Sequence, residues 1–149
     1  MDDNFQAMYA QFTNVWNSTI PGLSILTYVP EIRYQGLIYP EPDRTKYFCR
    51  LSTVTIRAEQ ATLAVSVGDP GRRRFKVRGL IFAQIFGPRQ DPGAYDIAGK
   101  LAKVGQSAFR AYPEDQNIWF TNATVENLDP DDNWVRWNVS ASFTFDEFE

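Results

Sequence analysis

The sequence contains no histidine and only one cysteine among its 149 residues. Without histidine, the chain has no imidazole to serve as a general base or as a metal ligand. With one cysteine, neither an internal disulfide nor a cysteine-based zinc site can form. Cys49 stands between Phe48 and Arg50 in a strand-like run. We therefore expect it to be a small packed residue and not a nucleophile.

Long apolar runs are also missing. No stretch approaches the roughly 20 apolar residues that a membrane helix needs. The N-terminal sequence MDDNFQ is acidic, whereas a signal peptide begins with basic residues and an apolar stretch. We therefore expect the protein to be made and used in the cytoplasm. Hydrophobic residues make up 44% and aromatic residues 15% of the chain, which favours a folded protein, and we expect one domain over residues 1–149.

Motifs of catalysis and cofactor binding are absent as well. The sequence holds no G-x-S-x-G, no P-loop and no dinucleotide fingerprint, so we expect neither an enzyme nor a cofactor. The segment DPDDN, residues 129–133, is rich in carboxylates, but it lacks the further spaced ligands of a calcium loop. Asp-Pro-Asp is common turn chemistry, and we interpret this segment as a turn.

Two helices and several strands are predicted by hydrophobic periodicity. Apolar residues recur at helical spacing over residues 4–18, and we expect this helix to end near Ser18 because Pro21 and Gly22 follow. A second helix is expected to end near Ala111, before Tyr112 and Pro113. We predict a mostly irregular segment at residues 30–45 and strands at residues 23–29, 46–57, 60–67, 72–86, 118–126 and 134–145. The expected fold class is α+β: a mainly antiparallel sheet with two helices packed on one face.

The basic residues gather at the start of the strand 72–86. RRRFKVRG, residues 72–79, holds five of the 15 basic residues of the chain. Alternation places most of them in one row, while further along both faces of the strand are apolar. A strand that is apolar on both faces needs cover on both sides. One cover can be a helix of the same chain and the other a neighbouring subunit.

Charge is divided along the sequence. Residues 1–112 hold 14 basic and 9 acidic side chains, and residues 113–149 hold one basic and 9 acidic ones. Complementary charges of this kind suit head-to-tail contact, with the basic segment against an acidic surface at Asp129, Asp131 and Asp132. An ordinary solvated sheet face and nucleic-acid contact through the basic strand both remain open interpretations.

Aromatic and basic residues alternate in the segment between residues 33 and 48. Such a pattern binds single-stranded nucleic acid by stacking, and it is equally typical of protein interfaces. The proline content of this segment favours the second interpretation. We predict a protein-contact arm formed by Arg33, Tyr34, Tyr39 and Arg44.

Four segments follow one another in a recognisable order: FTNVWN, RFKVRGLIFAQIFGPRQDPG, AYDIAGKLAKVGQSAFRAY and NIWFTNATVENL. This order resembles the tail terminator proteins of long-tailed bacteriophages. The resemblance covers most of the chain and is strongest over residues 74–111. It implies a structural subunit of a hexameric ring that caps the tail tube, ends tail elongation and provides the surface to which the head connector joins.

The resemblance also implies which proteins the chain contacts and where in the virion it lies. The partners would be further copies of the chain, the tail tube protein and the head–tail connector proteins, with no membrane involved. The place would be the head-proximal end of the tail in the virion, assembled in the host cytoplasm. We predict that the basic segment contacts the ring or tube, or lines the channel through which DNA passes. Its members are Arg72, Arg73, Arg74, Lys76 and Arg78. A head-side connector subunit and a small nucleic-acid-binding module are the alternatives.

Overall fold

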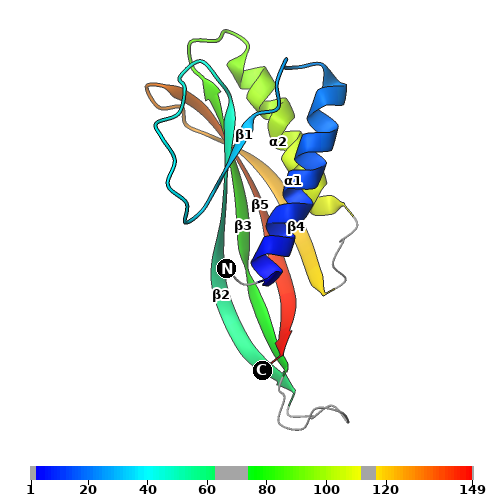
Figure 1. Ribbon diagram of the computed structural model, residues 1–149. Coiled ribbons are helices and arrows are strands. Elements are labelled where there is room, and N and C mark those ends of the chain that lie inside the picture. Colours follow the sequence, from blue (N-terminus) through cyan, green and yellow to red (C-terminus); the bar gives the residue numbers. More distant parts are fainter. Residues whose placement is uncertain (1–2, 63–73, 112–116, 149) are drawn as a thin grey trace.

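Each of two helices is followed by a run of strands in the computed structural model, which describes residues 3–62, 74–111 and 117–148. The elements in order are α1 (Asp3–Leu23), β1 (Glu31–Tyr34), β2 (Phe48–Thr62), β3 (Arg74–Pro88), α2 (Ala94–Arg110), β4 (Ile118–Leu128) and β5 (Trp134–Phe148). The strands form one sheet in the order β1-β2-β3-β5-β4. Only β1 pairs in parallel; the other three pairings are antiparallel. Both helices cover the same face (Figure 1), which confirms the predicted α+β class.

The main core lies between the helices and the sheet. The apolar stripe of α1 points inward, and its Phe12 and Trp16 are fully buried. The ring of Phe12 lies 5.4 Å from that of Trp16 and 5.3 Å from that of Phe109 in α2, measured between centroids. A side-chain atom at Gly105 would come within 3.3 Å of Phe12, so the glycine lets α2 approach α1 closely. The prediction that this stripe is core is therefore confirmed.

Helix α1 runs one turn further than the sequence predicted. It continues through Pro21 to Leu23 instead of ending near Ser18. Proline has no backbone N–H, so the bond from residue 21 to the carbonyl of Asn17 is missing, and the helix continues for only two more residues. The buried Ile20 anchors this turn in the core. Trp16 donates a hydrogen bond from Nε1 to the carbonyl of Pro30 (3.0 Å), which fixes the chain that leaves the helix.

Two strand predictions were wrong. Residues 24–30 form no strand, although apolar side chains of this segment still pack against the core. The strand lies a few residues later, at β1, inside the segment that was expected to be irregular. The predicted strands 46–57 and 60–67 are one continuous strand, β2, as far as Thr62. The remaining residues of the second predicted strand, 63–67, lie outside the described residues.

Strands β2, β3 and β5 continue well beyond the end of α1, at the lower end of Figure 1. We call residues 57–62, 74–78 and 144–148 the three-stranded extension, at whose start β4 still pairs with Thr144 and Phe145. It begins at a bulge in β2 between Thr55 and Arg57. Gly79 in β3 lies opposite Thr55, and a side-chain atom there would clash with the carbonyl of Val54 and lie 2.5 Å from the ring of Phe143. Glycine is therefore required beside the bulge, where the extension begins.

Candidate functional site

The described members of the predicted basic contact lie in the three-stranded extension. Arg72 and Arg73 fall outside the described residues, and Arg74 is the first residue of β3. Lys76 and Arg78 follow on the face that the helices leave uncovered, which we call the open face. Lys76 is half-buried and Arg78 is exposed.

Acidic residues of β5 lie beside this basic segment. Asp146 stands opposite Lys76, and Glu147 stands opposite Phe75. Cross-strand partners project to the same face, so Asp146 shares the open face with Lys76 and lowers the positive potential there. The division of charge along the sequence is therefore not a division in space.

The predicted acidic surface lies at the other end of the sheet, in the turn between β4 and β5 (Figure 1). This turn contains Asp129, Asp131 and Asp132. One carboxylate oxygen of Asp131 accepts hydrogen bonds from the backbone N–H of Asn133 (2.9 Å) and of Trp134 (2.7 Å). The interpretation of this segment as a turn is confirmed, and one of its carboxylates is engaged in forming it.

Two arginines hold the backbone of the same turn. Arg136 donates from Nη2 to the carbonyl of Asp129 (2.8 Å), and Arg89 donates from Nη1 to the carbonyl of Asp131 (2.6 Å). The aspartates therefore have positive neighbours. Twelve residues of β3 separate Lys76 from this end of the sheet, which corresponds to about 40 Å at roughly 3.4 Å per residue. The two predicted contact surfaces thus lie at opposite ends of the subunit.

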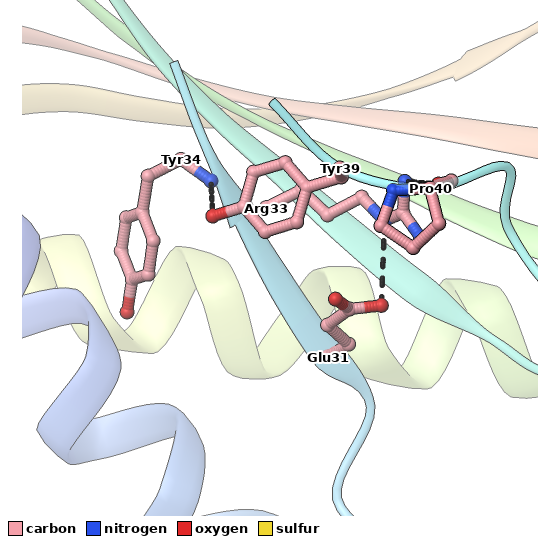
Figure 2. Close-up of polar contacts among 5 residues, drawn as sticks. All are labelled: Glu31, Arg33, Tyr34, Tyr39 and Pro40. Carbon is pink, nitrogen blue, oxygen red and sulfur yellow. Dashed lines mark hydrogen bonds and ion pairs between the residues drawn. The ribbon is translucent and has the colours of Figure 1, made fainter. Parts of the chain in front are cut away.

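Arg33, from the predicted protein-contact arm, is packed into its own chain (Figure 2). Its guanidinium lies between the rings of Tyr39 (5.1 Å) and Phe48 (5.3 Å). Nη1 donates to the carbonyl of Pro40 (2.6 Å), and Nε pairs with Glu31 (3.3 Å). Only 11% of the side chain is exposed. Arg33 therefore fastens the loop between β1 and β2 onto the sheet.

Tyr34 has a similar internal role. Its hydroxyl shares a hydrogen bond with that of Thr13 in α1 (2.8 Å), and its ring lies 5.8 Å from that of Tyr9. Its backbone N–H donates to the hydroxyl of Tyr39 (2.9 Å; Figure 2). Of the four predicted arm residues, only Arg44 is exposed. The segment is therefore a loop that is fastened to its own subunit.

Large exposed apolar side chains lie on surfaces that were not predicted from the sequence as contact sites. In the loop between β1 and β2, Leu37 is 61% exposed and Ile38 is fully exposed. Elsewhere, Ile56 is 65% and Trp119 is 55% exposed. A sequence signal existed for the first pair, because it follows Gly36 in a segment with no helical or strand periodicity.

The open face is covered at one end. Phe48, Phe86 and Trp134 form a buried aromatic cluster there, in which the first two rings are stacked at 4.6 Å. Arg33 lies over Phe48, and Arg50 lies over Phe86 at 5.3 Å. The loop between β1 and β2 and these two arginines thus shield this end from solvent.

The middle of the open face carries apolar side chains without such cover. Val54 in β2 stands opposite Leu80 in β3, and Phe82 follows on the same face. Val54 is 52% exposed, and the other two are half-buried. On the other side of β3, the partners of Phe82 and Leu80 are Ser140 and Ser142. We call Val54, Leu80 and Phe82 the apolar band.

Reactive groups offer little chemistry in the described part of the chain. Cys49 is fully buried, and burial raises the pKa of its thiol, as expected for a packed residue. No three His, Cys, Asp or Glu residues gather there as metal ligands would. None of the described helices is long and apolar enough to cross a membrane.

Comparison with known proteins extends the description of the fold. No family model and no curated protein matches the sequence. A solved structure of a protein whose name describes no function is similar, with a TM-score of 0.60 and 13% sequence identity. The similarity covers 97% of this chain and 96% of the other. At this identity the likeness shows a shared α+β fold over nearly the whole chain.

Proposed function

We propose that this chain is a structural subunit that assembles with copies of itself into a ring. The observation that carries the proposal is the apolar band on the open face. Val54 is 52% exposed although it lies within a long, regular strand beside Leu80. Burial of an apolar side chain stabilises an assembly by about 1.5–3 kcal/mol when the burial is complete. The band therefore favours association.

The ends of the subunit support a head-to-tail arrangement. The basic residues Lys76 and Arg78 lie at one end of β3, and the aspartate-containing turn lies at the other. A contact between different surfaces of identical subunits closes into a ring when the rotation between neighbours allows. Asp146 offsets Lys76, so the exposed Arg78 at one end and the exposed Asp132 at the other would set the register of that contact.

The resemblance to tail terminators suggests where such a ring would act. On this view the ring caps the tail tube of a long-tailed bacteriophage, ends elongation and presents a surface to the head connector. The observed order of α1, the β2–β3 pair, α2 and the β4–β5 pair is compatible with that interpretation. The basic extension would face the tube, a neighbouring subunit or the DNA channel.

Assembly of the purified protein tests the ring. We expect sedimentation velocity to show a concentration-dependent oligomer and electron microscopy to show rings. Val54→Asp places a charge in the apolar band and should abolish the oligomer while the monomer stays folded by circular dichroism. Gln90→Asp adds the same charge at an exposed loop position outside the band and should assemble normally. A wild-type chain that stays monomeric at all concentrations would contradict the proposal.

Silencing the gene during infection tests the role in the tail. Overlong tails without heads are expected from loss of a tube cap. Tails of normal length beside separate filled heads would instead indicate a head-side connector. Binding of the purified chain to DNA, with affinity that falls steeply as salt increases, would indicate a nucleic-acid-binding module.

A further inference from the structure

The exposed pair Leu37 and Ile38 stands at the tip of the loop between β1 and β2. Ile38 is fully exposed, and Leu37 is 61% exposed although it lines a hollow beside Tyr9 of α1. Neither of them contributes to the core cluster of the fold. The turn that presents them contains Gly36 with φ of +88°, a conformation that favours glycine.

The backbone on both sides of this tip is fixed. Before it, Gln35 donates from its backbone N–H to the carbonyl of Leu51 (3.0 Å). The side chain of Gln35 accepts a hydrogen bond from the backbone N–H of Thr53 (2.9 Å). After the tip, Tyr39 and Pro40 are held by the bonds drawn in Figure 2. The pair is therefore presented rigidly, which reduces the entropy lost on binding.

An apolar groove lies on the helical layer. It has a volume of about 470 Å³ and runs between the end of α1 and the middle of α2. Leu23, 46% exposed, and the half-buried Ile25 form one wall, and Val104 lies in the other. Pockets that bind small ligands have volumes of roughly 300–1,000 Å³. The groove therefore has room for the side chains of a leucine and an isoleucine.

The charges around the tip and the groove are complementary. Glu41 and Asp43 follow the tip and are exposed. Lys100 and Lys103 line the groove. Lys100 already pairs with Asp96 at 3.0 Å, which leaves Lys103 as the cation best placed to meet an acidic loop. Such complementarity selects the partner and the orientation.

We propose that the tip Leu37–Ile38 of one copy of this chain inserts into the α1–α2 groove of the next copy. Leu37 lies beside the N-terminal half of α1, whereas the groove lies at the C-terminal end of this helix, so the two surfaces are separate on the subunit. One subunit can then donate its tip on one side and accept a tip on the other, as a ring requires. This inference rests on the proposed ring and adds the contact that joins its neighbours.

Cross-linking between differently labelled chains tests the contact. Ile38→Cys and Leu23→Cys chains are mixed and treated with a short bismaleimide. The native Cys49 is fully buried and does not compete. We expect a covalent dimer in the mixture and none from either variant alone. A dimer from Ile38→Cys alone would show tip against tip, and no dimer in the mixture would show no insertion; either result overturns the inference.

Assembly of substituted chains provides the second measurement. Ile38→Asp should weaken association at least about tenfold, whereas Ile38→Leu should assemble like the wild type. Glu41→Lys and Lys103→Glu should each weaken association by about fivefold or less, and the chain that carries both should recover. Equal assembly of Ile38→Asp and the wild type would overturn this contact alone. A monomeric wild type would overturn both the contact and the ring.

Discussion

The two faces of β3 carry similar side chains in different surroundings. On the helix face, Ile81 and Ile85 are fully buried and Val77 is 4% exposed. On the open face of the same strand, Leu80 and Phe82 are only half-buried. Adjacent residues of comparable hydrophobicity thus meet a packed layer on one side and solvent on the other.

The apolar residues on the two faces therefore have different roles. Those on the helix face stabilise the monomer, because α1 and α2 cover them. Those on the open face contribute less to folding and remain available for contact with another molecule. We therefore expect substitutions on the two faces to lower the free energy of unfolding of the monomer by different amounts, measured by urea unfolding at low protein concentration.

The largest loss is expected on the helix face. Phe12→Ala removes a fully buried ring that packs on Trp16 and Phe109, and it should lower the free energy of unfolding by about 3–5 kcal/mol. Phe82→Ala on the open face is the matched substitution and should cost well under half as much. Equal losses in the two variants would show that the open face is as important for folding as the helix face.

The next effect is expected at Gly79, where the extension begins. Gly79→Ala brings a methyl group against the carbonyl of Val54 and the ring of Phe143, and overpacking of this kind costs about 1–3 kcal/mol. Gly22→Ala is the control, because nothing lies within 4 Å of its added atom. Alanine also favours a helix over glycine, so the control should be neutral or slightly stabilising. Normal stability of Gly79→Ala would mean that the bulge adapts.

A smaller, pH-dependent effect is expected at the margin of the helix face. The hydroxyl of Tyr47 donates to a carboxylate oxygen of Asp91 (2.7 Å), and the backbone N–H of Gly93 donates to the other (2.9 Å). These bonds, the first before the second, hold the pKa of Asp91 below its usual value of 3.8. A lowered folded-state pKa stabilises the fold above the unfolded pKa, and this gain is lost as the pH falls through the folded pKa.

Tyr47→Phe should therefore lower the free energy of unfolding by about 1 kcal/mol near neutral pH. The gap between variant and wild type should narrow as the solution is acidified below 3.8, the usual pKa of Asp91. Thermal unfolding across this pH range measures the gap. A gap that stays constant from neutral to acid pH would show that the hydrogen bond does not depend on the charge of Asp91.

The smallest effect on the monomer is expected in the apolar band. Val54→Thr keeps the branched shape that strands favour, and Val54 is 52% exposed, so the change should stay within about 0.5 kcal/mol. Its effect should appear instead in association, measured by sedimentation at high concentration. A large loss of monomer stability would indicate that Val54 belongs to the folding core.

Much of this fold could be predicted from periodicity. The stripe of α1, the helix α2 and the strands β3, β4 and β5 were expected within a few residues of their observed bounds. Each has a long, regular pattern, and regular patterns report directly on burial. The errors lie where the pattern is short. Strand β1 has only four residues and is defined by pairing with β2, which no local signal reveals.

The candidate site was harder to predict from the sequence than the fold, because it depends on which distant segments pack together. The basic and acidic thirds of the sequence were expected to form separate surfaces, yet Asp146 and Lys76 face each other across neighbouring strands. The arm was selected for aromatic and basic residues that proved to hold the loop from inside, as Arg33 does. Its exposed tip residues, Leu37 and Ile38, are apolar like core residues, and the sign in the sequence that they lie outside is the preceding Gly36 in a segment without periodicity.

The strand order has a consequence for how the chain folds. Strand β5 lies between β3 and β4 although it follows both in sequence, so β4 can join the sheet only through β5. Until β5 inserts, β3 presents an unpaired edge that can recruit strands from other chains. Late closure of this kind favours aggregation at high synthesis rates. Pulsed hydrogen exchange should therefore show the β3 amides that bond to β5 becoming protected after those that bond to β2; simultaneous protection would indicate a concerted closure of the sheet.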